Sequence, residues 1–251
     1  TKISITFSFI DMLIDLEILN SKYNLDVKNI AHVGVNNGLE IESYNNVFPN
    51  SKLILIEPQK KIYERLNYKF KDFKNIKLYN IALGDKPGKS KLNLSTTHNG
   101  SASLLNPTLH KKIHPEVIFS GSEEVNVEKF DNLNLDNVNF LNLDTQGYEL
   151  KILKGASKSL ENIDYIIAEI NTIQLYENSA TLVEIDRYLG QFGFTRLITV
   201  FWNDECYWGD AFYIKNKLIS NKLIYKSKIK NQIIKYKLFY NIAKKIKKWF
   251  S

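Results

Sequence analysis

Two neighbouring stretches decide the fold of this chain: Ile30-Ala-His-Val-Gly-Val-Asn-Asn-Gly38 and Leu53-Ile-Leu-Ile-Glu57-Pro58. The first predicts a short apolar strand over 30–33 that runs into a turn with two glycines, followed by a helix from residue 39. The second predicts a buried strand that ends in one acid. Together they indicate a nucleotide site, because the turn admits a ligand to the backbone and the acid accepts hydrogen bonds from ribose hydroxyls.

The spacing of the glycines indicates which nucleotide binds. Dinucleotide sites carry Gly-x-Gly-x-x-Gly and aim free N–H groups at a pyrophosphate, whereas this chain has Gly34-x-x-x-Gly38 with Asn36 and Asn37 between the glycines. Two small positions and two amides suit an amino-acid tail better than a diphosphate. S-adenosylmethionine has such a tail and also a ribose, so it is the cofactor that we expect.

The length and composition are those of one large α/β domain. The chain has 251 residues, of which 44% are hydrophobic, and this suffices for one sizeable core. It contains no apolar run of about 18 residues, so we expect no transmembrane helix, and no signal-peptide pattern is visible. The single cysteine, Cys206, excludes an internal disulfide and a cysteine-based zinc site, and it favours a cytoplasmic location.

The positive charge is concentrated at the C-terminal end. The whole chain carries +7, and residues 216–251 contain eleven lysines and no acid, so residues 1–215 carry −4. We therefore expect three parts: a flanking helical segment over 1–27, a main domain over 28–215 and a basic tail over 216–251.

Strand and helix signals alternate along the main domain, which predicts a doubly wound, mainly parallel sheet with helices on both faces. We expect helices at 5–22, 39–47, 59–70 and 181–192, strands at 30–33, 53–56, 76–83, 125–127, 138–143 and 165–170, and an antiparallel pair at 194–201 and 211–214. Pro87-Gly88 predicts a hairpin between the 76–83 strand and residues 90–94. Residues 95–122 show no regular pattern and are expected to form a substrate lid.

Several polar residues follow the predicted strands. Ligands of such sheets bind at the carboxyl ends of the strands. This rule brings the 34–38 turn, Glu57, Leu83-Gly84, Asp144 and Glu169 to one rim. Their convergence predicts a single ligand site there.

The segment Asp144-Thr-Gln-Gly-Tyr-Glu-Leu-Lys-Ile-Leu-Lys-Gly-Ala156 resembles the FkbM-type methyltransferase family, whose members use S-adenosylmethionine, mostly to methylate hydroxyl groups. Further pieces follow in the order of the family: Val33-Gly-Val-Asn-Asn-Gly38, Phe48-Pro49, Ile56-Glu-Pro58, Asn80-Ile-Ala-Leu-Gly84, Ser101-Ala-Ser-Leu104 and Gly209-Asp-Ala-Phe212. The likeness covers residues 28–215. It implies a class I methyltransferase (Rossmann-like) fold, with a seven-stranded sheet whose last strand is antiparallel.

Carried over residue by residue, the resemblance assigns contacts to the cofactor S-adenosyl-L-methionine. It implies that Gly34, Asn36 and Gly38 cradle the methionine portion. Glu57 would hold the ribose diol, and Ala82-Leu83 would flank the adenine. The implied contact set also includes Pro58, Ser103, Asp144 and Gln146.

One position departs from the family pattern. The family usually has an acid where His32 stands, and that acid helps to organise the methionine-binding turn. Without this acid we expect either weaker cofactor affinity or substitution of the acid by Asn36 and a water. His32 itself, on an apolar strand, is most simply a core residue. An alternative is that the cofactor site has decayed and that the chain is a non-catalytic binding module.

Methyl transfer from a sulfonium is an in-line displacement, so the enzyme mainly positions the nucleophile. A sugar hydroxyl is weakly acidic and gains typically about 10²–10⁴-fold from a general base. Asp144 is our first candidate, although it could instead orient the cofactor or cap the next helix. Glu169 is a second candidate. Glu149 is another, unless it is only a first-turn acid that the helix dipole favours.

Three histidines of the 95–122 segment, His98, His110 and His114, have a suitable pKa for a base. We count His98 with Asp144 and Glu169 in the expected catalytic set. His110 and His114 are spaced like half of a metal site, but Pro115 interrupts the helix and no His-Glu-x-x-His pattern occurs. We therefore expect no metal.

The tail predicts an amphipathic helix. From Ile233 onward one side carries apolar residues and lysines lie elsewhere; the apolar positions are Phe239, Ile242, Ala243, Ile246, Trp249 and Phe250. Such a helix suits an anionic membrane surface. The alternatives are packing on the domain or on a second copy in a homo-oligomer, and a nucleic-acid-binding arm. The tail has no arginine, which argues against phosphate-specific recognition, and we do not expect a nucleic-acid partner.

The function predicted from these features is S-adenosylmethionine-dependent O-methylation of a sugar hydroxyl in polysaccharide biosynthesis. The acceptor would be a cell-surface polysaccharide or a glycolipid, and the enzyme would lie peripherally at the inner face of the membrane. The alternatives are O-methylation of a small metabolite or natural product, the non-catalytic module, and a nucleic-acid methyltransferase that rests on the lysines alone.

Overall fold

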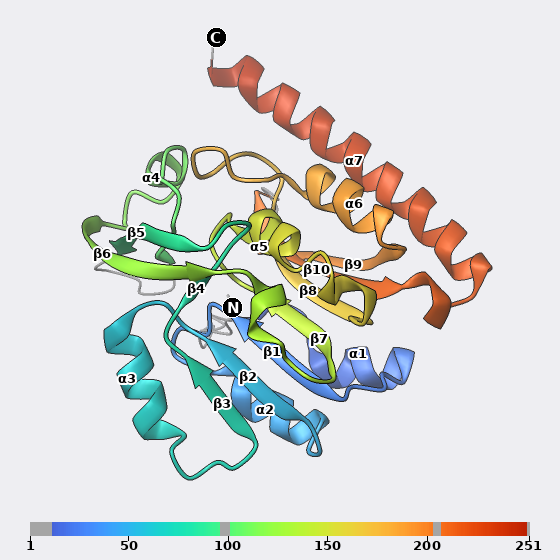
Figure 1. Ribbon diagram of the computed structural model, residues 1–251. Coiled ribbons are helices and arrows are strands. Elements are labelled where there is room, and N and C mark those ends of the chain that lie inside the picture. The colour runs from blue at the N-terminus through green and yellow to red at the C-terminus, as the bar shows by residue number, and fades with distance from the viewer. Residues whose placement is uncertain (1–11, 96–100, 203–206, 250–251) are drawn as a thin grey trace, which may run out of the picture.

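The computed structural model describes residues 12–95, 101–202 and 207–249, and within the last helix it describes side chains up to residue 238 (Figure 1). Residues 5–11 of the expected first helix, the candidate base His98 and the single cysteine therefore lie outside the described residues. So do the side chains of the apolar positions that we expected between 239 and 250 of the tail.

Seven strands form the main sheet, in the order β3-β2-β1-β7-β8-β10-β9. Their bounds are β1 Asn29–Val33, β2 Lys52–Ile56, β3 Ile76–Tyr79, β7 Val138–Leu143, β8 Tyr165–Asn171, β9 Phe194–Phe201 and β10 Trp208–Lys215. β10 runs antiparallel to both of its neighbours, and the other pairs are parallel. The expected seven-stranded, mainly parallel sheet with an antiparallel last strand is confirmed.

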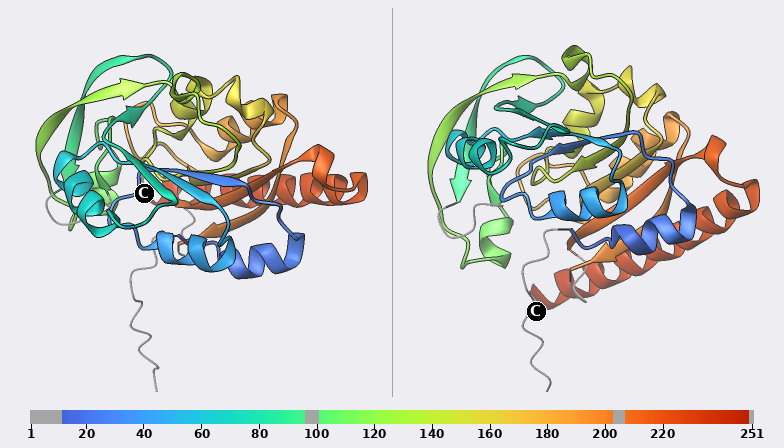
Figure 2. Two further views of the ribbon diagram at one scale, coloured as in Figure 1. Left: turned by 60° about the horizontal axis from the view of Figure 1, so that its bottom comes forward. Right: turned by 90° about the horizontal axis from the view of Figure 1, so that it is seen from below.

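Helices cover both faces of this sheet (Figures 1 and 2). They are α1 Leu16–Tyr23, α2 Glu40–Val47, α3 Lys60–Lys69, α5 Glu149–Gly155 and α6 Leu182–Gln191. Alternate strand residues supply two cores, because successive side chains of a strand point to opposite faces. Leu53 and Leu55 of β2 pack with α1, α2 and α3, whereas Ile54 and Ile56 pack with α5 and α6.

Helix α7, Asn221–Trp249, is the basic tail, and its helical structure agrees with the prediction. It contacts β9 at the edge of the sheet (Figure 1). Leu238 packs on the core that contains Ile54 and Ile56. Leu223, together with Ile219 just before the helix, packs on the core that contains Leu53 and Leu55. No helix in the described part of the chain is both long enough and apolar enough to cross a membrane.

A second sheet corrects two expectations. The predicted 76–83 strand is two strands, because Asn80 leaves the main sheet and its side-chain amide donates to the carbonyls of Glu57 and Pro58 at 3.0 and 2.9 Å. β4, Ala82–Leu83, joins a small sheet with β5, Gly88–Ser95, and β6, Phe119–Glu128, in the order β4-β6-β5. The predicted hairpin across Pro87-Gly88 is wrong, since β5 pairs with the distant β6.

The 95–122 segment is more regular than expected. β6 begins inside it, and the short helix α4, His110–Ile113, also lies there. Three 3₁₀ turns complete the described structure: η2 Phe130–Leu133, η3 Ser159–Glu161 and η4 Asn216–Leu218.

The first helix starts later than the apolar period suggested. Asp15 is its N-cap and accepts a hydrogen bond from the N–H of Ile18 at 2.9 Å. Just before it, the N–H of Leu13 donates to Asp210 of β10 at 2.6 Å. Residues 12–14, just before the cap, are therefore held against the sheet and are not helical.

Candidate active site

The strand register brings polar residues to one rim of the main sheet. The last residues of β1, β2 and β7 are register partners, and the residues that follow them are Gly34, Glu57 and Asp144. β7 and β8 continue the same register, so Asp144 lies beside Glu169, whose partner on β10 is Asp210. The expected convergence of the strand ends is present, and Asp210 extends it.

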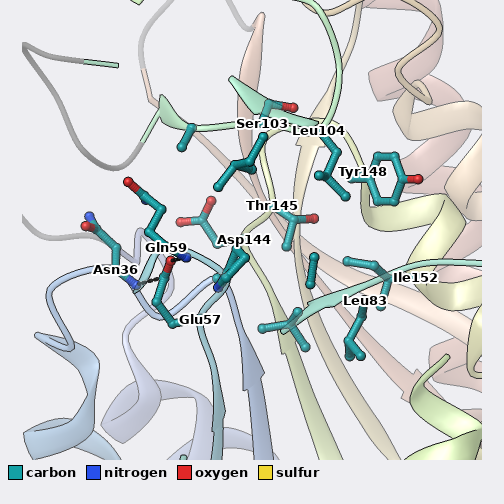
Figure 3. A pocket seen from close by; sticks show the side chains of 16 residues that line it. Asn36, Glu57, Gln59, Leu83, Ser103, Leu104, Asp144, Thr145, Tyr148 and Ile152 are labelled. Carbon is teal, nitrogen blue, oxygen red and sulfur yellow. Dashed lines mark hydrogen bonds between the residues drawn. The ribbon is translucent and has the colours of Figure 1, made fainter. Parts of the chain in front are cut away.

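A cavity opens at this rim (Figure 3). Its lining residues are Val33, Gly34, Asn36, Glu57, Pro58, Gln59, Ala82, Leu83, Leu92, Ala102, Ser103, Leu104, Asp144, Thr145, Tyr148 and Ile152. The volume of the cavity is about 50 Å³, so a nucleoside-sized ligand would extend beyond it. Of the residues that we expected around the cofactor, all line the cavity except Gly38 and Gln146.

The turn after β1 depends on its glycines. Gly34 has φ +87°, and a Cβ there would lie 1.8 Å from the carbonyl oxygen of Asp144. Any side chain at this position would force β1 and β7 apart. Gly38 also has positive φ, +67°, but its Cα faces Leu66 and Phe70. It shapes the turn from behind and is not exposed to the cavity.

Glu57 ties this turn to the start of α3. Its side chain is buried, Oε2 accepts from the N–H of Asn36 at 2.9 Å, and Oε1 accepts from the N–H of Gln59 at 2.8 Å (Figure 3). Burial raises the pKa of Glu57 to about 7, against the effect of these two hydrogen bonds. A carboxylate oxygen accepts more than one hydrogen bond, so each oxygen keeps capacity for a ligand donor.

Gln146 bridges two of the rim acids. Its Nε2 lies 3.0 Å from Oδ1 of Asp144 and 3.0 Å from each carboxylate oxygen of Glu169. Tyr176 donates its hydroxyl hydrogen to Oε1 of Gln146 at 2.9 Å. This bond identifies the oxygen end of the amide, so the NH₂ end faces both acids.

The rim acids share an environment that favours protonation. Burial raises the pKa of Asp144 and of Glu169 well above the usual range. Repulsion from neighbouring acids raises both pKa values further, and Asp144 is among the acids that act on Glu169. Burial also raises the pKa of Asp210 to about 7, although the N–H groups of Leu13 and Ile14 donate to it. Burial and repulsion thus both favour the protonated forms of Asp144 and Glu169.

Glu149 and Ser103 hold the loop that carries Gln146. Glu149 is buried, and its Oε1 accepts from the N–H and hydroxyl of Thr145 at 3.0 Å and from the N–H of Gly147 at 3.1 Å. Ser103 donates its hydroxyl hydrogen to the carbonyl of Gln146 at 2.8 Å. Glu149 does not line the cavity, so its contacts are those of a positioning residue.

The described histidines lie away from the cavity. His32 is buried in the core beside Tyr44, and burial lowers its pKa to about 3. This placement agrees with a neutral core histidine. His110 packs on Tyr176 and His114, and burial lowers its pKa to about 4. Within residues 12–95, 101–202 and 207–249, no three His, Cys, Asp or Glu side chains are arranged to hold a metal ion.

Two tryptophans continue the rim beyond the acids. The rings of Trp202 and Trp208 are stacked, with centroids 5.1 Å apart and an interplanar angle of 13°. Trp202 is 45% exposed. Trp208 lies two residues before Asp210 on β10, so their side chains share one face of the sheet. An exposed indole face therefore stands beside the acidic part of the rim.

Sequence reasoning missed several of these residues. Tyr148 lay inside the quoted segment from 144 to 156 and could have been included. Gln59 follows the expected ribose acid directly, and its position was a usable signal. Tyr176 and Trp202, by contrast, come from loops or strand ends with no local pattern, and only the tertiary fold brings them to the rim.

The model of the family described as "Methyltransferase FkbM domain" matches residues 31–196 of this chain. No curated protein sequence matches this chain. Among solved structures, the chain is similar to methyltransferase FkbM from Methylobacillus flagellatus KT, with 14% identity and a TM-score of 0.52 over 75% of this chain and 44% of that chain. The present chain thus spans less than half the length of that protein.

Two further solved structures show weaker similarity. One is magnesium protoporphyrin IX methyltransferase from Synechocystis PCC 6803 with bound SAM, with 11% identity and a TM-score of 0.45 over 80% of this chain and 76% of that chain. The other is Aeropyrum pernix fibrillarin in complex with natively bound S-adenosyl-L-methionine, with 10% identity and a TM-score of 0.43 over 79% and 74%.

Proposed function

The chain belongs to the FkbM methyltransferase family, and from this premise we propose that it transfers a methyl group from S-adenosylmethionine to a hydroxyl group of a sugar. The observation that carries this proposal is the continuity of the rim. A cavity with a ribose-type acid, Glu57, opens directly beside the bridged acids Asp144 and Glu169. The donor and the acceptor hydroxyl would meet at Asp144.

The residues of the cavity fit the cofactor. Glu57 is fixed by two backbone N–H groups and keeps acceptor capacity for a ribose diol. Leu83, Leu104 and Ile152 provide apolar walls for a purine. Gly34 and Asn36 present the backbone of the turn to the amino-acid tail. When bound, S-adenosylmethionine supplies an electrophilic methyl group.

Asp144 is the residue best placed to accept the proton of the hydroxyl. Gln146 occupies Oδ1, and among the described residues Oδ2 makes no hydrogen bond. In its ionised form Asp144 would accept the proton of the hydroxyl at Oδ2, and burial, which raises the pKa of this acid, makes the ionised form a stronger base. Glu169, which does not line the cavity, would tune Asp144 through Gln146.

The aromatic rim supports a sugar acceptor. A sugar ring has apolar C–H faces and a polar edge of hydroxyl groups. The exposed face of Trp202 suits the apolar C–H faces of the ring. The acids beside Trp208 suit its hydroxyl groups. A small metabolite with a hydroxyl group is the second candidate. It would use the same base but would not need Trp202.

The outer face of α7 supports the proposed position at a membrane. Tyr225, Ile229, Ile233 and Tyr236 form a stripe along one side of the helix and are 68%, 45%, 51% and 73% exposed. Lysines flank this stripe on both sides. An exposed apolar stripe between cations matches a helix that lies on an anionic lipid surface. Each lysine near such a surface contributes about 1 kcal/mol.

The experiment that tests the reaction is transfer of an isotope-labelled methyl group from S-adenosylmethionine. The acceptors would be a polysaccharide fraction, a glycolipid fraction, total RNA and a panel of hydroxylated small molecules. We expect label in O-methyl sugars after acid hydrolysis of the glycan fractions, identified by mass spectrometry. Label confined to RNA or to the small molecules would contradict the sugar proposal, and no binding of S-adenosylhomocysteine would favour the non-catalytic module.

A further inference from the structure

A second cavity is lined by residues of α6, α7 and the strands between them, and it shares no lining residue with the cavity at the rim. Figure 1 shows α6 and α7. Its lining residues are Leu182, Val183, Asp186, Arg187, Gly190, Phe194, Thr195, Arg196, Tyr213, Lys228, Asn231, Gln232, Lys235 and Leu238. Its volume is about 380 Å³, within the range of small-molecule sites. None of these residues has a role in the proposed methyl transfer.

A buried ion pair belongs to the wall of this cavity. The Arg196 side chain is 2% exposed, and its Nε and Nη2 donate to Oδ1 and Oδ2 of Asp186, each at 2.9 Å. Tyr213 donates its hydroxyl hydrogen to Oδ1 of Asp186 at 2.9 Å. Both carboxylate oxygens are therefore engaged, and Asp186 is committed to Arg196.

The remaining charges of the lining are positive. Arg187 comes from α6, and Lys228 and Lys235 come from α7. Asp186 is the one acid among the lining residues, and it already matches Arg196. Glu184 also interacts electrostatically with Arg187, but it does not line the cavity. The cavity thus presents an excess of positive charge.

The two walls are held in fixed positions. Asn231 of α7 donates its side-chain amide to the carbonyl of Arg196 on β9 at 2.9 Å. Ser227, one turn earlier, is buried. These contacts fix α7 against β9, so the lysines on the cavity side start from a defined backbone. Such preorganisation lowers the entropy lost when they bind an anion.

We propose that this cavity binds a phosphomonoester, either on a lipid headgroup or on a small soluble molecule. A phosphomonoester carries nearly two negative charges and several acceptor oxygens near neutral pH, which suits a lining in which cationic residues outnumber acidic ones by three. The planar guanidinium of Arg187 suits two-point binding of phosphate oxygens. The basic tail lacks arginine, but the main domain supplies it here, and this changes the expectation that the tail does not recognise phosphate.

The position of the cavity favours the lipid source. Lys228 lies on α7 between the cavity and the exposed stripe, one residue before Ile229 of that stripe. If the stripe lies on a lipid surface, Lys228 of the cavity lining lies next to the headgroups. The site itself does not depend on methyl transfer.

Binding would be measured with the full chain by calorimetry, using glycerol 3-phosphate as the soluble probe and vesicles of phosphatidylcholine with or without phosphatidic acid as the lipid probe. The test variant is Lys228→Gln/Lys235→Gln. The matched control is Lys226→Gln/Lys230→Gln, which removes the same charge from exposed positions of the same helix outside the cavity. Arg187→Gln is a second test variant from another element.

We expect Lys228→Gln/Lys235→Gln to lose about tenfold or more in affinity for the phosphomonoester, since each charge-assisted hydrogen bond is strong. The control should lose less than about twofold on glycerol 3-phosphate. On phosphatidic acid vesicles it should lose only the general attraction of two lysines to an anionic surface, which is less than the test variant loses. If the test variant loses affinity only for phosphatidic acid vesicles, the ligand is a lipid headgroup. If it loses affinity for glycerol 3-phosphate, the ligand is a soluble molecule. Equal losses in test and control variants, or no phosphate-dependent binding by the unmodified chain, would overturn the proposal. Circular dichroism and S-adenosylhomocysteine binding would establish that each variant is folded.

Discussion

The hydroxyl of Tyr176 donates a hydrogen bond of 2.9 Å to Oε1 of Gln146. This single contact from a loop orients the amide that bridges Asp144 and Glu169. Because the bond fixes the amide, we infer that Tyr176 controls how the two acids share a proton. It is a positioning residue for the proposed base.

We expect Tyr176→Phe to lower kcat about tenfold, because Gln146 then loses a buried partner, which costs about 1–3 kcal/mol. The affinity for S-adenosylhomocysteine should stay unchanged, since Tyr176 does not line the cofactor cavity. The decisive measurement is the pH profile of kcat, whose apparent pKa should move. A lower kcat with an unmoved profile would reduce Tyr176 to a packing residue.

Asp144→Asn tests the base directly. We expect kcat to fall about 10²–10⁴-fold, because the variant cannot take the proton of the hydroxyl. The dissociation constant of S-adenosylhomocysteine should change only severalfold, because the variant retains the shape of the side chain. Initial rates and calorimetry measure the two quantities. Equal losses in both would mean that Asp144 orients the cofactor and is not the base.

The stability of the ligand-free protein should fall as the pH rises from 5 to 8. The pKa values of Glu57 and Asp210 are raised to about 7 in the folded state from 4.5 and 3.8. Between these values the folded state binds more protons than the unfolded state, so its stability is greatest below the unfolded pKa and is lost as the pH rises through about 7.

Thermal unfolding at a series of pH values measures this effect as a decrease in Tm toward pH 8. Asp210→Asn should flatten the dependence, because it removes one of the titrating groups and keeps an oxygen for the N–H of Leu13. A Tm that rises steadily between pH 5 and 8 would show that these acids are not protonated in the folded state.

The exposed stripe of α7 gives a separate prediction. Ile229→Gln/Ile233→Gln should weaken sedimentation with anionic vesicles, because it removes apolar area that would enter the lipid surface. The fold should be unaffected, since both side chains are exposed. Binding to anionic vesicles that is unchanged in this variant would argue for packing of the stripe on a protein partner.

Much of the rim could be predicted from the sequence, because short local signals specify it. Apolar runs define β1, β2, β7 and β8, and the polar residue after each run falls at the carboxyl end of a parallel strand. That rule alone predicts that Glu57 and Asp144 lie at the rim. The mainly parallel architecture follows from the alternation of helices and strands.

Other parts depend on long-range pairing that no local pattern encodes. β5 pairs with β6, more than twenty residues away, and the turn signal at Pro87-Gly88 suggested the wrong partner. Asp210 joins the acids only through antiparallel pairing of β10 with β8. The tail was correctly expected to be helical, but the exposed stripe from 225 to 236 and the cavity lined by α6 and α7 depend on how α7 packs on β9.

The central claim is that the rim holds S-adenosylmethionine with Glu57 on the ribose. It is tested most directly by calorimetry with S-adenosylhomocysteine on the unmodified chain and on Glu57→Gln, with Glu64→Gln, an exposed acid of α3, as the matched control. We predict micromolar binding by the unmodified chain and the control, and a loss of about tenfold or more in Glu57→Gln, because a carboxylate accepts stronger hydrogen bonds than an amide. An unmodified chain that does not bind, or a Glu57→Gln variant that binds equally well, would contradict the claim.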